Sequence, residues 1–159
     1  MRGFSTTDRA LCIPDNAAMT DAATPVTLDT LREALRDWFA PWVQDLGLQV
    51  ESMGNGEATL RLPVNASLSR VGGMVCGQAL MAAADTAMVM AIVTQLGNRR
   101  PMTTVQLNTS FLKPLSGQDA LVTATVLRAG KSLVFGEIDI RGANDGKSVC
   151  RASTTYALL

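Results

Sequence analysis

The spacing of apolar residues predicts an amphipathic helix near the start of the chain. Between residues 28 and 46, large apolar side chains recur at intervals of three and four, as in a helix that buries one face. Thr30 and Glu33 have the spacing of a capping box, and Gly47 is of a type that commonly ends a helix. Pro41 should kink this helix or divide it into two pieces, because proline lacks the amide hydrogen that a helix interior requires.

The segment from Gly77 to Gln95 is apolar around its whole circumference. Between residues 79 and 93 only Asp85 and Thr86 are not apolar. A helix without a polar face is expected to be buried on all sides. A membrane span is the alternative, but the apolar run of about 15 residues is shorter than the ~20 that a bilayer needs, and a charge interrupts it. We therefore predict a central helix inside a globular domain.

Six further segments have the Val-, Thr- and Ile-rich composition and the turn-forming breaks that are typical of β-strands. Gly54-Asn55-Gly56 predicts a hairpin turn between the first two segments, and residues 63–73 are expected to form a loop. Short breaks separate the last four segments, and strands joined by such short connections must pair in antiparallel orientation. The chain is thus predicted to be an α+β protein with a curved antiparallel sheet of about six strands around the central helix. The segments are residues 48–52, 57–62, 103–112, 120–128, 133–141 and 148–158.

The length of 159 residues fits one domain and a tail. Residues 27–159 are assigned to the domain. Residues 1–26, most of which are rich in Ala, Thr and Asp without a clear period, are assigned to a mobile tail. The first 18 residues contain no apolar run of the length that a secretory signal needs. Met19 is a second candidate for the first residue of the protein.

Charge and cysteine content narrow the classes of function. The chain has 14 basic and 14 acidic residues, so the basic face that nucleic-acid binding needs is not indicated. The three cysteines are far apart and form no CxxC pair, which argues against a disulfide framework and a zinc site. A reducing cytoplasm is the expected location.

The chain contains no histidine. This excludes Ser-His-Asp and Cys-His machinery and metal sites built on imidazole, so any general acid or base must be a carboxylate, Lys, Tyr or Cys. Asp85 then becomes important, because an ionised carboxylate in apolar surroundings is costly unless it is paired, protonated or beside a polar cavity. It is either a structural acid that caps a group or pairs with a basic residue, or a base or nucleophile in a cleft.

The position of Asp85 along the predicted helix suggests a shared site. The free amides and positive dipole end of the helix near Gly77 suit a carbonyl that becomes an oxyanion. Gly77 and Asp85 are separated by ~12 Å of helical rise, too far for both to act on one carbon. An antiparallel helix from a second subunit would bring them together, which predicts a two-fold dimer. Gln78 lies two turns before Asp85 on the same face, where it either lines the groove or is a polar residue at the helix edge.

Several motifs resemble one known family. They are Val71-Gly72-Gly73-Met74-Val75-Cys76-Gly77-Gln78, Ala83-Ala84-Asp85-Thr86-Ala87, Thr104-Val105-Gln106-Leu107-Asn108-Thr109-Ser110-Phe111-Leu112-Lys113-Pro114 and Gly130-Lys131-Ser132. Together they resemble hotdog-fold thioesterases of the phenylacetic-acid-pathway (PaaI-like) type over about residues 45–158. The resemblance implies hydrolysis of acyl- or aryl-CoA thioesters. It also implies that Asp85 activates water or attacks the carbonyl, and that the Gly77 amide polarises the thioester oxygen across the dimer.

One motif departs from this family. Many of its members carry His-Gly-Gly where this chain has Cys76-Gly77-Gln78, so the usual histidine contact is absent while the acid and the amide are kept. A nucleophilic Cys76 is disfavoured, because no histidine can activate it and a buried cysteine usually acts as a small apolar side chain. Cys76, Gln78 and Thr86 are taken as candidate substrate-binding residues.

Coenzyme A would be part of the substrate, and no separate cofactor is expected. Its phosphates need basic side chains at the mouth of the groove, and Lys131 with Ser132 is preferred because the family-like turn is there. The other candidate cations are Arg99, Arg100, Lys113 and Arg128. A hotdog dehydratase is disfavoured because it needs a histidine, whereas a non-catalytic acyl-CoA-binding module remains the alternative. The expected partners are an acyl- or aryl-CoA substrate and further copies of the chain, as a dimer or tetramer, with no nucleic acid and no membrane.

Overall fold

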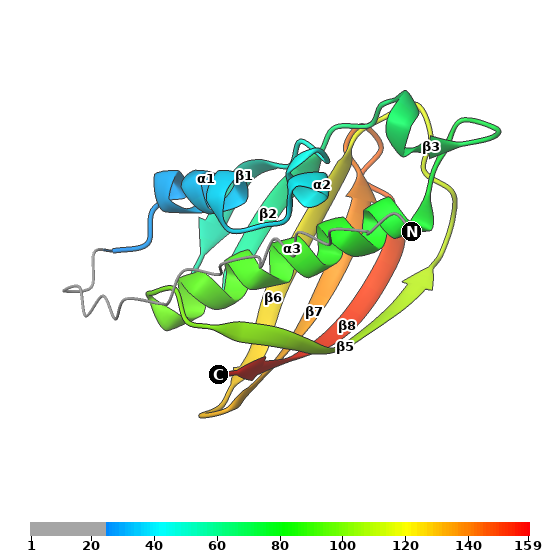
Figure 1. The fold of residues 1–159 in the computed structure, drawn as a ribbon. Coiled ribbons are helices and arrows are strands. Elements are labelled where there is room, and N and C mark those ends of the chain that lie inside the picture. The colour runs from blue at the N-terminus through cyan, green and yellow to red at the C-terminus, as the bar shows by residue number, and fades with distance from the viewer. Residues whose placement is uncertain (1–24) are drawn as a thin grey trace, which may run out of the picture.

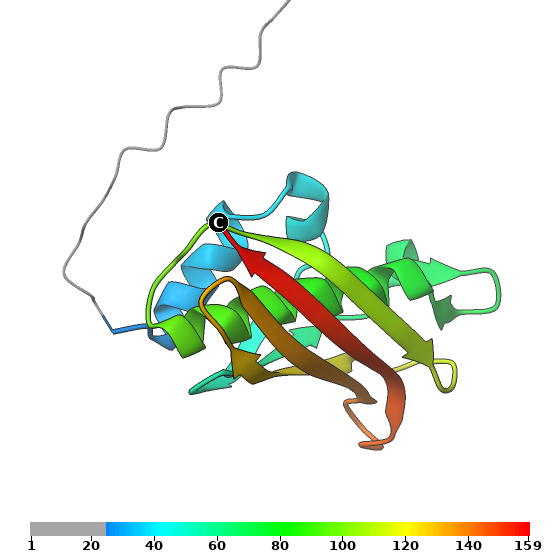
Figure 2. The ribbon, with the colours of Figure 1, turned by 90° about the horizontal axis from the view of Figure 1, so that it is seen from below.

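A six-stranded antiparallel sheet curves around one long helix in the computed structural model, which describes residues 25–159 (Figures 1 and 2). The strand order is β1-β2-β6-β7-β8-β5. The predicted α+β architecture is confirmed, whereas nearly all of the predicted mobile tail, residues 1–26, lies outside the described residues. The helices are α1 (Leu28–Asp37), α2 (Pro41–Gln44) and α3 (Gly77–Leu96). The strands are β1 (Gln49–Gly54), β2 (Glu57–Leu62), β3 (Ser69–Arg70), β4 (Met74–Val75), β5 (Met102–Phe111), β6 (Ala120–Ala129), β7 (Leu133–Gly142) and β8 (Ser148–Leu158).

The helix predicted over residues 28–46, with a kink or a division at Pro41, is divided into the two helices α1 and α2. Pro41 occupies the first turn of α2, where a missing amide hydrogen costs nothing, so the predicted division at this proline is confirmed. The capping box was wrongly placed at Thr30 and Glu33. Thr27 is the N-cap: its hydroxyl accepts a hydrogen bond from the Thr30 amide, and the Thr30 hydroxyl accepts one from the Thr27 amide, at 3.2 Å each.

The central helix α3 packs on strands β2, β6 and β7. Its alanines, among them Ala83, Ala84 and Ala87, are fully buried and allow the helix to lie close to the sheet. By length and composition α3 could cross a membrane, but 61% of its most apolar window is buried inside the domain. The surrounding sheet therefore accounts for its apolar character. The helix ends at Gly97, which adopts a left-handed conformation with φ of 72°.

The predicted loop 63–73 contains short ordered pieces. A 3-10 helix spans Ala66–Leu68, and the two-residue strands β3 and β4 pair with each other. Elements this short contain too few residues for a periodic pattern, which is why the sequence indicated only a loop. They position the start of α3, because the Cys76 amide donates to the Leu68 carbonyl at 2.8 Å.

The two edges of the sheet differ. Strand β1 has six residues, includes Glu51 and is contacted by α1. Strand β5, at the other edge, has ten residues of sequence MTTVQLNTSF, none of them charged. Most β5 residues are exposed, including Val105 at 61% and Phe111 at 51%. The β5 edge thus presents a long uncharged row of backbone groups to the outside.

Candidate functional site

Asp85 lies on the one stripe of α3 that the sheet leaves partly open. Gln78 and Met81 are exposed and Asp85 and Val89 are half-buried, whereas most of the helix between them is buried. Spacings of three and four residues place these side chains on one helical face. The partly open stripe lies toward β5, because Thr104 of that strand contacts Asp85.

Two hydroxyl groups hold one oxygen of the Asp85 carboxylate. The Thr104 hydroxyl donates to Asp85 Oδ1 at 3.0 Å, and the Tyr156 hydroxyl donates to the same oxygen and lies 3.0 Å from the Asp85 backbone carbonyl. Thr104 on β5 and Tyr156 on β8 are direct partners in the strand register. The sheet therefore presents both donors together to the helix.

Tyr156 stays protonated in this position. Its side chain is 1% exposed, and burial, together with the neighbouring negative charge of Asp85, raises the pKa of Tyr156 far above its ordinary value. A protonated phenol can donate its hydrogen to the carboxylate, so Tyr156 holds the Asp85 side chain in place. Sequence reasoning missed Tyr156 and Thr104. The only available signal was that Tyr156 is the single tyrosine of a chain without histidine.

The second oxygen of Asp85 remains available. Within residues 25–159, Oδ2 has no hydrogen bond and is not among the buried polar atoms that lack a partner, so it reaches solvent. No ion pair in this part of the chain includes Asp85, which does not support the structural reading as half of a salt bridge. The carboxylate is thus fixed through one oxygen and open through the other, the arrangement that a base or a nucleophile needs.

The N-terminus of α3 is uncapped. Its N-cap, Cys76, makes no side-chain hydrogen bond to the helix, and the Gly77 amide has no partner within the described residues. A Cβ atom at position 77 would lie 2.9 Å from the Phe111 ring of β5, so the ring lies directly over this turn. An open pocket of about 470 Å³ begins here, and it is lined by Arg70, Met74, Val75, Gly77, Leu80, Phe111, Leu112, Lys113, Pro114 and Leu115.

Gly77 and Asp85 remain apart within one chain. Eight residues of continuous helix separate them, which corresponds to a rise of ~12 Å. Asp85 does not line the pocket at Gly77. One chain therefore carries two separate candidate groups: a fixed carboxylate in the middle of α3, and the Gly77 amide beside a pocket at its start.

The candidate substrate-binding residues are distributed unevenly around these two groups. Cys76 is half-buried at the start of α3 and Gln78 is exposed on the stripe of Asp85. Thr86 is 2% exposed and its hydroxyl donates to the Ala82 carbonyl at 2.8 Å, so it points into the core and away from the stripe.

Lys131 and Ser132 form the turn between β6 and β7, at the opposite end of α3 from Gly77 (Figures 1 and 2). The Ser132 carbonyl there accepts a hydrogen bond from the Leu158 amide at 2.8 Å. Lys113 is the one sequence-predicted cation that lines the pocket at Gly77, where Arg70 joins it.

Comparisons with known proteins agree with this architecture. The family model described as "Thioesterase superfamily" matches residues 72–149, from just before α3 into β8. "Putative esterase SSO1253" of Saccharolobus solfataricus is 30% identical over 66% of this chain and 68% of its own length. Zebrafish thioesterase superfamily member 2 shares 26% identity and a TM-score of 0.75, covering 84% of this chain and 99% of that one. The E. coli PaaI protein from the phenylacetic acid degradation operon has the same fold at 22% identity, with a TM-score of 0.72 over 83% of this chain and 93% of its own.

The fold is therefore a hotdog fold, with the helix as its centre and the curved sheet around it. The chain belongs to the thioesterase superfamily, as the resemblance of its motifs implied. At this general level it is a thioester hydrolase.

Proposed function

We propose that the protein is an acyl-CoA thioesterase in which Asp85 acts on the thioester carbonyl. The observation that carries the proposal is the state of the Asp85 carboxylate, held through Oδ1 by Tyr156 and Thr104 and open through Oδ2. In a chain without histidine, this group is the best-positioned base or nucleophile that the described residues offer.

Two routes are compatible with this geometry. As a base, Oδ2 takes a proton from water while the water oxygen adds to the carbonyl carbon. Collapse of the adduct then expels the CoA thiolate, which takes up the proton from Asp85. As a nucleophile, Oδ2 itself adds and displaces the thiolate, and water then cleaves the resulting anhydride. A single turnover in H₂¹⁸O separates them: label in the Asp85 carboxylate indicates the nucleophilic route, and label confined to the product acid favours the base.

The negative charge that develops on the carbonyl oxygen must be stabilised by a hydrogen-bond donor. The uncapped amide of Gly77, at the positive end of the α3 dipole, is suited to it. Because this amide is ~12 Å along the helix from Asp85 of the same chain, we propose that the amide of a second copy completes each site. The long uncharged edge of β5 supports this dimer, since exposed backbone groups and apolar side chains there are available for pairing.

The direct test is thiol release from a panel of acyl- and aryl-CoA substrates, with oxygen esters of the same acids alongside. We expect CoA thioesters to be hydrolysed in preference to oxygen esters. A protein that binds acyl-CoA tightly and releases no thiol would be the non-catalytic binding module instead.

A charge on the β5 edge should weaken association and activity together. Val105→Lys places a cation on the exposed edge, where it would lose solvation on pairing. Leu127→Lys on β6 is the matched control, because both side chains are 61% exposed. We expect light scattering to report a dimer or larger assembly for the parent and the control, and a shift toward monomer with lost turnover for Val105→Lys. A parent that is monomeric and fully active would contradict the shared site.

Removing the Tyr156 hydroxyl should impair turnover more than binding. Tyr156→Phe keeps the ring in the core but deletes a donor to a charged group, which predicts a fall in kcat of about tenfold. KM should change little, because the hydroxyl contacts the carboxylate and is not among the candidate substrate-binding groups.

Thr154→Val is the control for Tyr156→Phe. Thr154 lies on the same strand and is buried, but its hydroxyl donates to the Gln106 carbonyl at 2.8 Å. This variant should lose stability and keep its kcat. An unchanged kcat in Tyr156→Phe would contradict a positioning role for Tyr156.

We also propose a reducing, cytoplasmic location. Cys76 and Cys150 are free thiols, and burial raises the pKa of Cys150 to about 11, which keeps it protonated and unreactive at neutral pH.

A further inference from the structure

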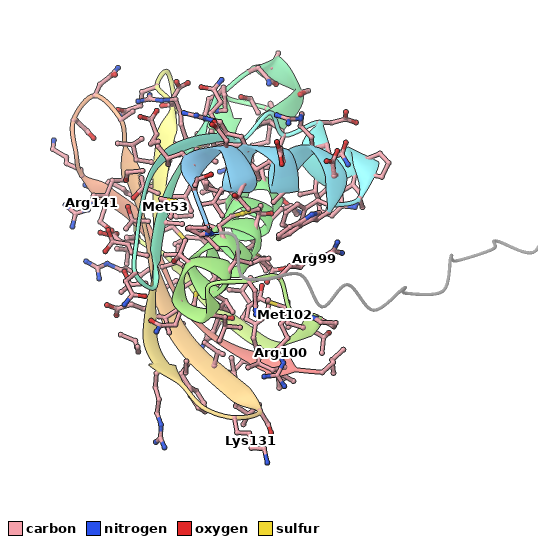
Figure 3. The ribbon with its side chains drawn as sticks, turned by 90° about the vertical axis from the view of Figure 1, so that its left-hand side faces the viewer. Met53, Arg99, Arg100, Met102, Lys131 and Arg141 are labelled. Carbon is pink, nitrogen blue, oxygen red and sulfur yellow. The ribbon has the colours of Figure 1, made fainter. Side chains whose placement is uncertain are left out.

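A second pocket lies at the other end of α3, away from Gly77. Its volume is about 270 Å³, and it is lined by Trp38, Phe39, Val89, Arg99, Arg100, Pro101, Met102 and Leu159. Arg99, Arg100 and Met102 lie on one side of the molecule, and Arg141 on the opposite side (Figure 3). The end of α1, the linker between α3 and β5, and the last residue of the chain thus build one concave surface, called here the arginine pocket.

The arginine pocket combines apolar walls with two cations. Most of the lining side chains are apolar or aromatic, and none is acidic. Neither Arg99 nor Arg100 takes part in an ion pair within residues 25–159. The guanidinium of Arg99 lies over the Trp38 ring, 4.7 Å from its centroid. This stacking uses the face of the guanidinium and leaves its N–H edge free to bind an anion.

The arginine pocket adjoins the Asp85 carboxylate along two elements. Val89 is one helical turn beyond Asp85 on α3, a rise of ~6 Å. Met102 precedes Thr104 by two residues on β5, a separation of ~7 Å. A thioester carbonyl at Asp85 Oδ2 therefore has this pocket within reach.

The short distance between Asp85 and the arginine pocket determines which end of the substrate the pocket can bind. The phosphates and adenine of coenzyme A are separated from the thioester by the pantetheine arm, about as long as four extended residues or ~14 Å. The acyl group starts at the carbonyl carbon itself. A pocket that opens ~6 Å from the carboxylate is thus matched to the acyl group and is too close for the nucleotide.

We propose that the arginine pocket selects acyl groups that have an apolar or aromatic body and a distal anionic group such as a carboxylate. The inference rests on the proposed function and names its substrate class. The apolar walls would cover the body of the acyl group, and the two guanidinium groups would bind the distal anion through charge-assisted hydrogen bonds.

The test compares two non-hydrolysable thioether analogues, of hexanoyl-CoA and adipyl-CoA, by titration calorimetry. Both have six carbons, and only the second ends in a carboxylate. We expect the adipyl analogue to bind at least ~10-fold more tightly to the parent protein. Arg99→Gln and Arg100→Gln should each reduce this preference and leave the affinity for the hexanoyl analogue nearly unchanged.

Arg141→Gln is the matched control. Arg141 is exposed, lies far from the arginine pocket in Figure 3 and pairs with Asp139 on the surface, so its loss should cost little stability and should keep the preference. Arg100→Gln also guards against a folding defect in Arg99→Gln, since within residues 25–159 only Arg99 stacks on an aromatic ring. Melting temperatures identify any variant that does not fold.

Equal binding of the two analogues, or a preference that survives in both arginine variants, would overturn the inference. Hydrolysis of hexanoyl-CoA and adipyl-CoA is measured separately. If neither is hydrolysed while the arginine-dependent preference holds, the proposed function fails and the selectivity of the pocket stands. If both are hydrolysed without any arginine-dependent preference, the proposed function stands and the assigned substrate class is wrong.

Discussion

Asp85→Asn is expected to lower thioester turnover at least ~100-fold, the scale of a positioned acid–base group. The amide has nearly the shape of the carboxylate, and its carbonyl oxygen can still accept from Thr104 and Tyr156. What it loses is the charge and the ability to take a proton or attack a carbonyl. The variant should therefore fold normally and fail in chemistry.

Rates of thiol release across substrate concentrations provide the measurement. A fall in kcat with little change in KM is expected, because the proposed role of the carboxylate is at the reacting carbon and not at the body of the substrate. Asp139→Asn is the control: this carboxylate on β7 is also largely buried, but it bonds Ser148, Arg141 and Arg151. It should lose stability and keep turnover. Full activity in Asp85→Asn would remove Asp85 from the mechanism.

Gly136→Ala should destabilise the fold by about 2–3 kcal/mol, near the upper end of what overpacking a core costs. A Cβ at this β7 position would lie 2.3 Å from Met88 Cε and 3.0 Å from the Thr125 backbone oxygen. Met88 is a fully buried residue of α3, and the Thr125 carbonyl is fixed by sheet pairing. The new methyl group therefore requires the Met88 side chain to repack inside the core, and it also presses against a backbone carbonyl of the sheet.

Urea unfolding measures this loss, and Gly54→Ala is the control. Gly54 is also a strand glycine, but a Cβ there would meet only the Glu57 Cβ at an ordinary 3.7 Å. We expect a change of less than ~0.5 kcal/mol for Gly54→Ala. Met88→Ala in combination with Gly136→Ala should cost less than the sum of the two single changes, because the smaller side chain makes room for the new methyl group. Strict additivity would show that the contact with Met88 is not the cause.

The hydrophobic pattern was sufficient to predict the fold, because the apolar spacing typical of each helix or strand recurs along the length of that element. The all-round apolar run of α3 and the spaced strands after it leave few other arrangements. Asp85 could be identified as a candidate from the same pattern, because it is the only charged residue in the apolar run of residues 79–93. The capping box was misplaced because Thr27, Thr30 and Glu33 are evenly spaced, and only the backbone shows which one precedes the first turn.

The partners of Asp85 could not be predicted, because they depend on contacts far apart in sequence. Tyr156 is 71 positions away and Thr104 is 19. Both residue types are ordinary in strands, so neither departs from its local pattern. The same reason explains why the sequence does not place Arg99 and Arg100 near Asp85. Arg99 and Arg100 adjoin the site only because β5 returns along α3, and nothing in their own segment indicates that.

The edge of β5, uncharged and unpaired within residues 25–159, also affects how the protein behaves during expression. A long strand without charged residues is a template on which other unfolded or half-folded chains can add strands, so newly synthesised molecules are prone to aggregate before the edge is covered. Low expression temperature and slow synthesis should therefore improve the soluble yield. Val105→Lys introduces at this edge the type of residue that natural sheets use to prevent such addition, so it should remain soluble even where it no longer assembles.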